Sequence, residues 1–384
     1  MENINDTLSQ LNEKIKEMTV FQDIRDTASV LKLSGEILSS IDAIQNFDQL
    51  NKQAKAKLTY YKGRALAAAD IYEKAAEENL SRSIKLDPFN SEAWSWLGEV
   101  FYLKKDYVQS KRCFEGSLEQ SGPNKETLRK LSIVYRFLNS PEERSESVLK
   151  SIEIAKQALN LDLLDGESWY ILANAQLTNF FTNSPSYEEL GRSLKSYSQA
   201  LKFSNSFNPD LHFNRALAFN AGEMYKEALD ELSIVENDPM LNAAQKAGEI
   251  VENLRSIAGL IEKKCDAKRS VVKNFCKKIP NVLKSEERFK IVPLSELQEG
   301  VNENKMLSLA VLGYSKSDFP PVFVGCDFLG EFFAISIYNA SSATRIIKGN
   351  IAFIRNPVLL KVSVKDINYP SIQIRDPNTF MISH

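Results

Sequence analysis

Apolar positions along the first two thirds of the chain recur with the period of an α-helix. The first helix shows its apolar face at Leu8, Leu11, Ile15 and Met18. A second helix is predicted over 23–46, and helical segments continue to about residue 262. From 288 to 375 the pattern changes to short runs of β-branched and aromatic residues, separated by Gly, Pro, Asn and Asp. Such runs are typical of short strands, so an all-α part precedes an all-β part.

The helical segments repeat with a period near 34 residues. One repeat reads Trp94-x2-Leu97-Gly98-x2-Phe101 and then Ser110, Phe114 and Ser117. Gly63 and Ser132 hold the small position of Gly98 in the repeats before and after it, 35 and 34 residues away. This order of large, small and aromatic residues is that of the tetratricopeptide repeat, in which two helices form a hairpin. The small residues let the two helices approach closely, and stacked hairpins form a concave surface.

We therefore predict an α+β multidomain protein. An all-α tetratricopeptide-repeat superhelix of about six hairpins, the first one divergent, is expected over 1–262. A basic helical linker follows over 263–284, and a small all-β, OB-like barrel over 285–384. Six or so short strands fit such a barrel better than a seven-stranded sandwich.

The net charge of the chain is −2, but its charges are unevenly placed. The stretch from Lys263 to Lys290 contains ten Lys or Arg residues and three acids. Lys264 and Lys268 are spaced i,i+4, as are Arg269 and Lys273, so a helix here would carry a positive ridge. The ridge is either a solvated helix face or a surface for nucleic-acid phosphates.

Residues for catalysis or metal binding are scarce. The chain has two histidines, and His212 has no cysteine or acid at metal-ligand spacing. No phosphate loop, nucleophile elbow or dinucleotide motif is present. We expect no enzyme activity, cofactor or metal. Four cysteines without a paired motif, and the absence of a signal peptide or membrane span, predict a cytoplasmic and nuclear protein.

Several longer motifs exceed what the repeat pattern requires. They read LGEVFYLKKDY at 97–107, LSIVYRFL at 131–138, DGESWYILAN at 165–174, NPDLHFNRA at 208–216 and PLSELQEGVN at 293–302. With these motifs the chain resembles a family of tetratricopeptide-repeat proteins that carry a carboxy-terminal OB fold. Its members are known as transcription cofactors and as factors that recognise nascent tubulin at the ribosome during tubulin mRNA autoregulation.

The resemblance implies a non-enzymatic adaptor whose groove binds the first residues of nascent tubulin, Met-Arg-Glu followed by Ile or Cys. It also implies that the positive ridge, formed by Lys264, Lys268, Arg269 and Lys273, contacts ribosomal RNA phosphates. The alternative is a nuclear scaffold for transcription coactivators, acting as a stress-responsive cofactor of an acetyltransferase coactivator.

Such a peptide needs a base for its Glu and an acid for its Arg. Arg136 follows the packing residue Tyr135 on the first helix of the fourth repeat, and its guanidinium is expected to bind the peptide carboxylate. Asp210 either receives the peptide Arg or caps a helix that starts near Pro209. Asn174 and Asn214 are expected to hydrogen-bond the peptide backbone.

Aromatic residues in the β part suggest a second hypothesis, binding of single-stranded nucleic acid by base stacking. Phe333, Ile335 and Ile337 share one strand face, and Phe332 and Tyr338 share the other, so one set is expected in the core. Few Lys or Arg residues surround these aromatics. We therefore expect a structural or protein-binding barrel.

Overall fold

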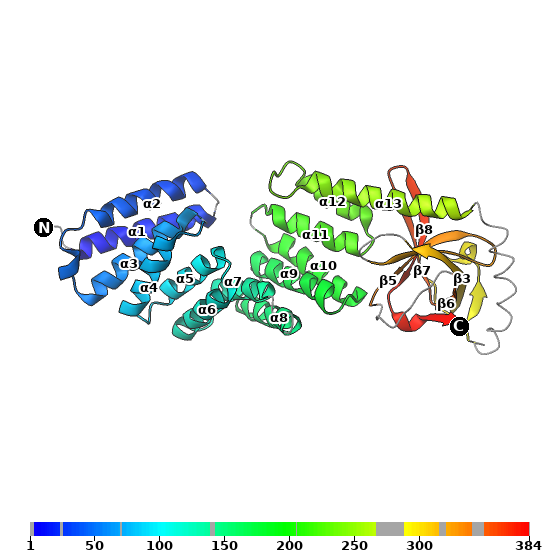
Figure 1. Ribbon diagram of the computed structural model, residues 1–384, viewed down its shortest axis with the longest axis horizontal. Coiled ribbons are helices and arrows are strands. Elements are labelled where there is room, and N and C mark those ends of the chain that lie inside the picture. The colour runs from blue at the N-terminus through cyan, green and yellow to red at the C-terminus, as the bar shows by residue number, and fades with distance from the viewer. Residues whose placement is uncertain are drawn as a thin grey trace. The chain divides into compact units, whose positions relative to one another are not determined.

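The computed structural model describes residues 4–23, 26–69, 71–138, 143–204, 206–265, 288–314, 320–339 and 349–383. Contacts divide the chain into two compact units, 1–175 and 176–384. The division falls inside helix α9 (Gly166–Thr182). Helical repeats precede a β domain, as predicted (Figure 1).

The first unit consists of helices that pair as hairpins. They are α1 (Ile4–Asp23), α2 (Thr27–Asp42), α3 (Lys52–Leu66), α4 (Lys74–Leu86), α5 (Ser91–Leu103), α6 (Tyr107–Ser121), α7 (Lys125–Phe137) and α8 (Arg144–Leu161). In the first hairpin, α1 buries Leu11 and Met18. The helix expected over 23–46 is the shorter α2.

Close approach at the small repeat positions is confirmed. A Cβ atom on Gly63 would lie 2.6 Å from Leu80 Cγ, and one on Gly98 would lie 2.8 Å from Phe114 Cε1. Both distances are too short for a side chain. In the next hairpin Ser132 and Ser151 each donate a hydroxyl to the other's carbonyl oxygen, at 2.9 and 2.8 Å. Small residues therefore determine how tightly each hairpin closes.

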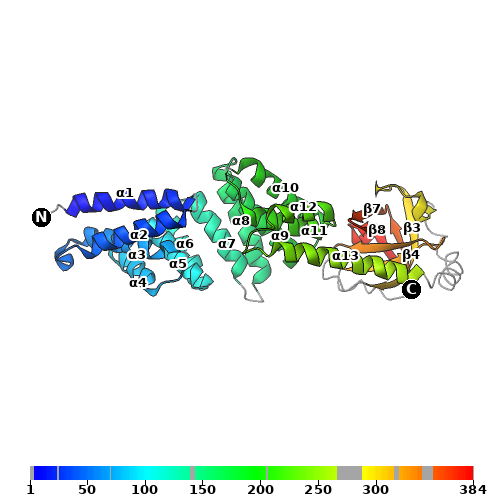
Figure 2. The same cartoon turned by 90° about the horizontal axis from the view of Figure 1, so that it is seen from above.

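The second unit contains the last helices together with the β domain. Its helices are α10 (Tyr187–Phe203), α11 (Pro209–Ala221), α12 (Tyr225–Ile234) and α13 (Ala243–Cys265). Helix α13 is the last of the helical segments, which were expected to continue to about residue 262, and it extends a few residues further. Figures 1 and 2 show α13 alongside the sheet, which it contacts through β5 and β8. The β domain thus packs directly on the end of the repeats.

Nine strands form the sheet within the described part of the β domain. They are β1 (Lys290–Val292), β2 (Gly300–Val301), β3 (Lys305–Tyr314), β4 (Val322–Cys326), β5 (Phe332–Ile337), β6 (Ile351–Arg355), β7 (Val358–Val364), β8 (Ile367–Ile374) and β9 (Phe380–Ser383). The strand order is β2-β7-β8-β5-β4-β3-β6-β9, and β1 pairs with β3. Pairing is antiparallel except for β5 with β8 and β1 with β3.

Both faces of β5 are buried, which corrects the expectation that only one of them belongs to a core. Phe333, Ile335 and Ile337 lie in the core of the β domain itself. Phe332 lies in a second core that the other face forms with α12 and α13. Tyr338 is also fully buried. These aromatic rings are therefore inaccessible to nucleic-acid bases.

A buried glutamate joins the turn between α11 and α12 to this sheet. Glu223 accepts hydrogen bonds from Ser336 Oγ, from Tyr338 OH at 3.2 Å, from Ser371 Oγ at 3.3 Å and from Gln373 Nε2 at 3.1 Å. Burial raises the pKa of Glu223 above its usual value, although the four hydrogen bonds oppose that shift. Its backbone is left-handed, with φ at 60°.

Candidate peptide-binding surface

In the first unit, polar contacts connect each first helix of a hairpin to the first helix of the next. Tyr60 on α3 donates its hydroxyl to Glu92 on α5 at 2.7 Å. Arg64 on α3 is 1% exposed, and its guanidinium lies 3.4 Å from the ring centre of Trp96 on α5. Such stacking is a strong contact for an arginine removed from water. These side chains lie on the face shared by the first helices.

The same face continues to α7 through charged side chains. Lys130 lies 2.9 Å from Glu99 on α5 and 3.1 Å from Glu126 on α7. Burial by itself would lower the pKa of Lys130. The carboxylates of Glu99 and Glu126 have a larger opposite effect, so the pKa of Lys130 is raised above its usual value. Arg129 pairs with Asp165 at 2.8 Å and with Glu167 at 3.0 Å. The charges of this face are therefore largely paired with one another.

Arg136, the predicted partner of a peptide carboxylate, lies in the last turn of α7 and is half-buried. It lies near the aromatic cluster of Tyr102, Tyr107 and Phe137, in which the rings of Tyr107 and Phe137 are stacked at 5.2 Å. Burial raises the pKa of Tyr102, and the charge of Arg136 opposes that rise. Arg136 is thus close enough to Tyr102 for its positive charge to favour ionisation of the Tyr102 hydroxyl.

Asn174 lies on α9 and is 7% exposed. Only a small part of its surface is therefore open to a ligand. Arg136 and Asn174 belong to the first unit, whereas Asp210 and Asn214 belong to the second. The joint site that the sequence suggests remains a prediction.

Asp210 and Asn214 lie one turn apart on α11, so their side chains share a face of that helix. The suggestion that Asp210 caps α11 is wrong, because Asn208 is the cap and accepts the Leu211 N–H at 3.2 Å. Asp210 lies in the first turn and is exposed. Among the residues described, it forms no ion pair.

His212 has a partner that sequence spacing did not indicate. Its Nδ1 lies 2.8 Å from a carboxylate oxygen of Glu231 on α12, and Arg215 pairs with the other oxygen at 2.8 Å. The pair joins the two helices of one hairpin, and 19 residues separate its members along the chain. It explains the partly buried histidine as a structural residue of the sixth repeat.

The predicted RNA-binding ridge falls almost entirely outside the described residues. Lys264 belongs to the last turn of α13, whereas Lys268, Arg269 and Lys273 lie in the undescribed stretch 266–287. Across the described ranges there is no cluster of three His, Cys, Asp or Glu residues suited to a metal ion. Over the same ranges, no helix combines the length and apolarity that a membrane crossing requires.

Known proteins are similar to both the helical repeats and the β domain of this chain. The sequence model of a family described as Tetratricopeptide repeat protein 5 OB fold domain matches residues 288–383. Tetratricopeptide repeat protein 5 of Mus musculus is 31% identical in an alignment 356 residues long, which covers 86% of this chain and 81% of the mouse protein. The Homo sapiens protein of that name is 28% identical, covering 100% of this chain and 94% of its own length.

Among solved structures, a tetratricopeptide-repeat protein of Thermus thermophilus is similar to part of the chain. It is 17% identical with a TM-score of 0.41, and the match covers 52% of this chain and 99% of the bacterial one.

Proposed function

Because the chain belongs to the tetratricopeptide repeat protein 5 family, we propose that it is a non-enzymatic adaptor whose first helices bind a short charged peptide. Family membership confirms the resemblance drawn from the sequence motifs. The observation that carries the proposal is Asp210, an exposed acid on a first helix with no ion pair to any described residue. An unpaired acid of this kind is available to a ligand cation.

The ligand we propose is the amino terminus of nascent tubulin, Met-Arg-Glu followed by Ile or Cys. Asp210 would receive the peptide Arg, and Asn214, one turn further along α11, would hydrogen-bond its backbone. Arg136 would pair with the peptide Glu, because a guanidinium binds a carboxylate through two parallel hydrogen bonds. Asn174 would provide a second backbone contact.

Calorimetry with a Met-Arg-Glu-Ile peptide and the full chain tests these roles. Removing one partner of a charge pair that binding desolvates costs about 2–5 kcal/mol, so Asp210→Ala and Arg136→Ala should each weaken binding about 30-fold or more. Asp230→Ala on α12 and Arg112→Ala on α6 are matched controls, since both side chains are exposed on second helices. Unchanged affinity in Asp210→Ala would refute the assignment.

A charge exchange makes the test sharper. Asp210→Arg should prefer Met-Glu-Glu-Ile over Met-Arg-Glu-Ile, because the new guanidinium repels the peptide Arg and attracts a Glu at that place. If the variant loses both peptides equally, Asp210 supports the fold of α11 and does not read the second residue of the peptide.

The proposed ribosome contact is a separate claim. If Lys264, Lys268, Arg269 and Lys273 bind RNA phosphates, co-sedimentation with ribosomes should fall steeply with salt. Replacing all four by Gln should abolish sedimentation and leave peptide affinity intact. Equal loss of both activities would show that the substitutions disturb the fold.

A further inference from the structure

Strand β7 has one side that the sheet leaves open over part of its length. On its other side it pairs with β8 from Val358 to Val364, whereas β2 pairs only with Val358 and Leu359. Beyond Leu359 no strand of the described chain lies against that side. The segment 360–364 is therefore an edge of the sheet, and such an edge can pair with a further strand.

The pairing with β2 shows which backbone groups face the open side. The Asn302 N–H donates to the Pro357 carbonyl oxygen at 3.0 Å, so the backbone of residue 357 points towards β2. Backbone groups alternate between the two sides of a strand, so those of Leu359, Lys361 and Ser363 point the same way. Leu359 is opposite β2, but in the described chain Lys361 and Ser363 have no strand opposite them. Their N–H and C=O groups are therefore available to a ligand, and both residues are exposed.

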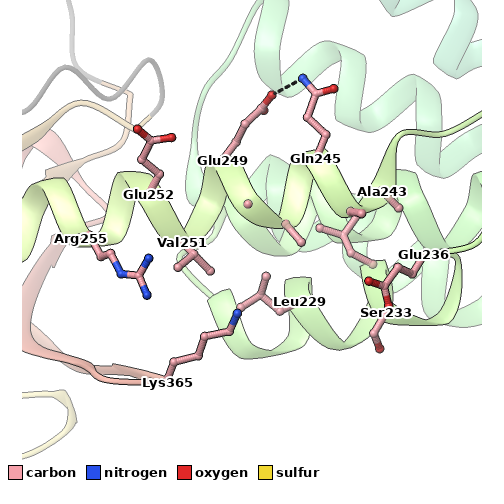
Figure 3. A pocket seen from close by; sticks show the side chains of 14 residues that line it. Leu229, Ser233, Glu236, Ala243, Gln245, Glu249, Val251, Glu252, Arg255 and Lys365 are labelled. Carbon is pink, nitrogen blue, oxygen red and sulfur yellow. Dashed lines mark hydrogen bonds between the residues drawn. The ribbon is translucent and has the colours of Figure 1, made fainter.

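The other face of this edge is anchored to the last helices of the repeats. Val362 and Val364 are buried in the core that the sheet shares with α12 and α13. Helix α12 contacts β7, and α13 contacts β8. Figure 3 shows Lys365, in the turn between β7 and β8, reaching towards Leu229 of α12. The edge is thus formed in advance, so a ligand need not pay to order it.

Lys361 determines which strand suits this edge. Its neighbours on the same face of the sheet are Leu359, Ser363 and Pro370, and none of them carries a charge. Glu331 lines the same pocket as Lys361, but its carboxylate accepts a backbone N–H at 2.9 Å and forms no ion pair with Lys361. A lysine on an open edge discourages pairing with an apolar strand, whereas an acid directly opposite it is favourable.

We propose that the 360–364 edge of β7 binds an extended segment of a partner protein as an added antiparallel strand. This pairing continues the antiparallel ladders that β2 and β8 form with β7. The segment would carry Asp or Glu opposite Lys361, Ser or Thr opposite Ser363, and an apolar residue opposite Val362 on the buried face. A second copy of this chain is a poorer occupant, because pairing centred on Val362 would place its lysine on the same face as Lys361.

The probe is the peptide Ser-Val-Thr-Val-Glu-Val, amidated at its carboxyl end, with the full chain as target. In antiparallel alignment the Thr is opposite Ser363, the following Val opposite Val362 and the Glu opposite Lys361. In the free chain the Lys361 and Ser363 amides should exchange hydrogen faster than those of Val362 and Val364, which face β8. An NMR titration to saturation with the probe should slow exchange at Lys361 and Ser363 at least tenfold.

Methylation of the probe's backbone separates strand addition from side-chain contact. An N-methyl group on Thr or Glu removes an N–H that faces β7, and it should weaken binding at least tenfold. An N-methyl group on the Val between them removes an N–H that faces away, and it should change affinity less than threefold. These probes leave the chain unaltered, so its folding cannot affect the comparison.

Two variants of the chain complete the test. Ser363→Pro removes an N–H that the sheet does not use, so it should weaken binding at least tenfold with little change in the urea midpoint. Lys361→Glu should weaken binding about two- to fivefold, and a probe with Lys in place of Glu should restore it.

Three outcomes would overturn the proposal. One is unchanged exchange at Lys361 and Ser363 with the probe in the millimolar range. Another is an equal loss of affinity from methylation at all three positions, which would mean that the strand alignment is wrong. The third is a dimer of the chain, seen by sedimentation equilibrium and lost in Ser363→Pro, which would identify a second copy as the occupant.

Discussion

Replacing Glu223 by Ala should destabilise the second unit of the chain. Four side chains donate to the carboxylate, and two of them have another acceptor nearby. Tyr338 OH also reaches the Ala221 carbonyl at 2.7 Å, and Gln373 Nε2 reaches the Gly222 carbonyl at 3.1 Å. These two donors can therefore remain satisfied when the carboxylate is removed.

The other two donors, Ser336 and Ser371, determine how much stability is lost in Glu223→Ala. Ser336 and Ser371 are fully buried, and in the described chain their hydroxyls have no second acceptor. A buried donor without a partner costs about 1–3 kcal/mol, so the two serines together cost about 2–6 kcal/mol. Removing a buried carboxylate also removes its own desolvation cost, which leaves a net loss of about 2–4 kcal/mol.

Urea unfolding followed by far-ultraviolet circular dichroism is the assay, with amide exchange of β5 and β8 as a local measurement. The loss corresponds to a midpoint lower by about 1–2 M. All three tryptophans, Trp94, Trp96 and Trp169, belong to the first unit, so the transition in their emission should move less. A loss of stability below about 1 kcal/mol would refute the claim that the hydroxyls of Ser336 and Ser371 are left without an acceptor at that cost.

The stability of the natural chain and of Glu223→Gln, measured across a series of pH values, tests how burial affects the ionisation of Glu223. The pKa of Glu223 is raised in the folded chain, so the folded state holds more protons than the unfolded state between the ordinary and the raised value. Stability of the natural chain should therefore fall as pH rises above about 4.3, relative to a variant that cannot ionise. A relative gain in stability over that range would show that hydrogen bonds, and not burial, dominate the pKa.

Two further pairs of substitutions test the repeats. Gly98→Ala should lower the free energy of unfolding by about 1–3 kcal/mol, because the added methyl group meets the Phe114 ring, whereas Gly191→Ala on α10 meets open space and should raise it by up to about 1 kcal/mol. Both changes are read from urea midpoints. Asn208→Ala should cost about 1 kcal/mol as the loss of a helix cap, and Asp210→Ala should cost less than about 0.5 kcal/mol. Equal losses at 208 and 210 would contradict the cap assignment.

The helical repeats were predictable because their signals are local. Gly98 and Phe114 belong to one hairpin, so the close contact between them appears as a fixed spacing in the sequence. Strand β8 is hard to delimit from the sequence because Pro370 lies in its middle, and proline usually marks an edge strand or an interruption. In the structure the pairing of β8 with β5 starts at Ser371, one residue beyond the proline. The missing N–H therefore falls outside that ladder.

The contacts that join the repeats to the β domain could not be predicted in this way. The side chains that donate to Glu223 lie 113 to 150 residues further along the chain. Nothing in the turn around Glu223 distinguishes it from an exposed acid, and only the fold brings Ser336 and Gln373 to it. Asp210 shows the same limit on a smaller scale, because two polar residues near Pro209 could each cap the helix and only the backbone geometry selects Asn208.

The paired charges on the first helices limit which peptides the proposed peptide-binding surface can recognise. A peptide carboxylate that approaches Lys130 must compete with Glu99 and Glu126, which already hold the ammonium group at 2.9 and 3.1 Å. Exchanging one carboxylate for another gains little free energy, so such a contact discriminates against wrong ligands more than it adds affinity. Asp210 has no ion pair to give up among the described residues, so a ligand cation there competes with water and not with a resident cation. Recognition of the peptide Arg by Asp210 should therefore contribute more affinity than a peptide carboxylate could gain at Lys130, which is not the proposed partner of the peptide Glu.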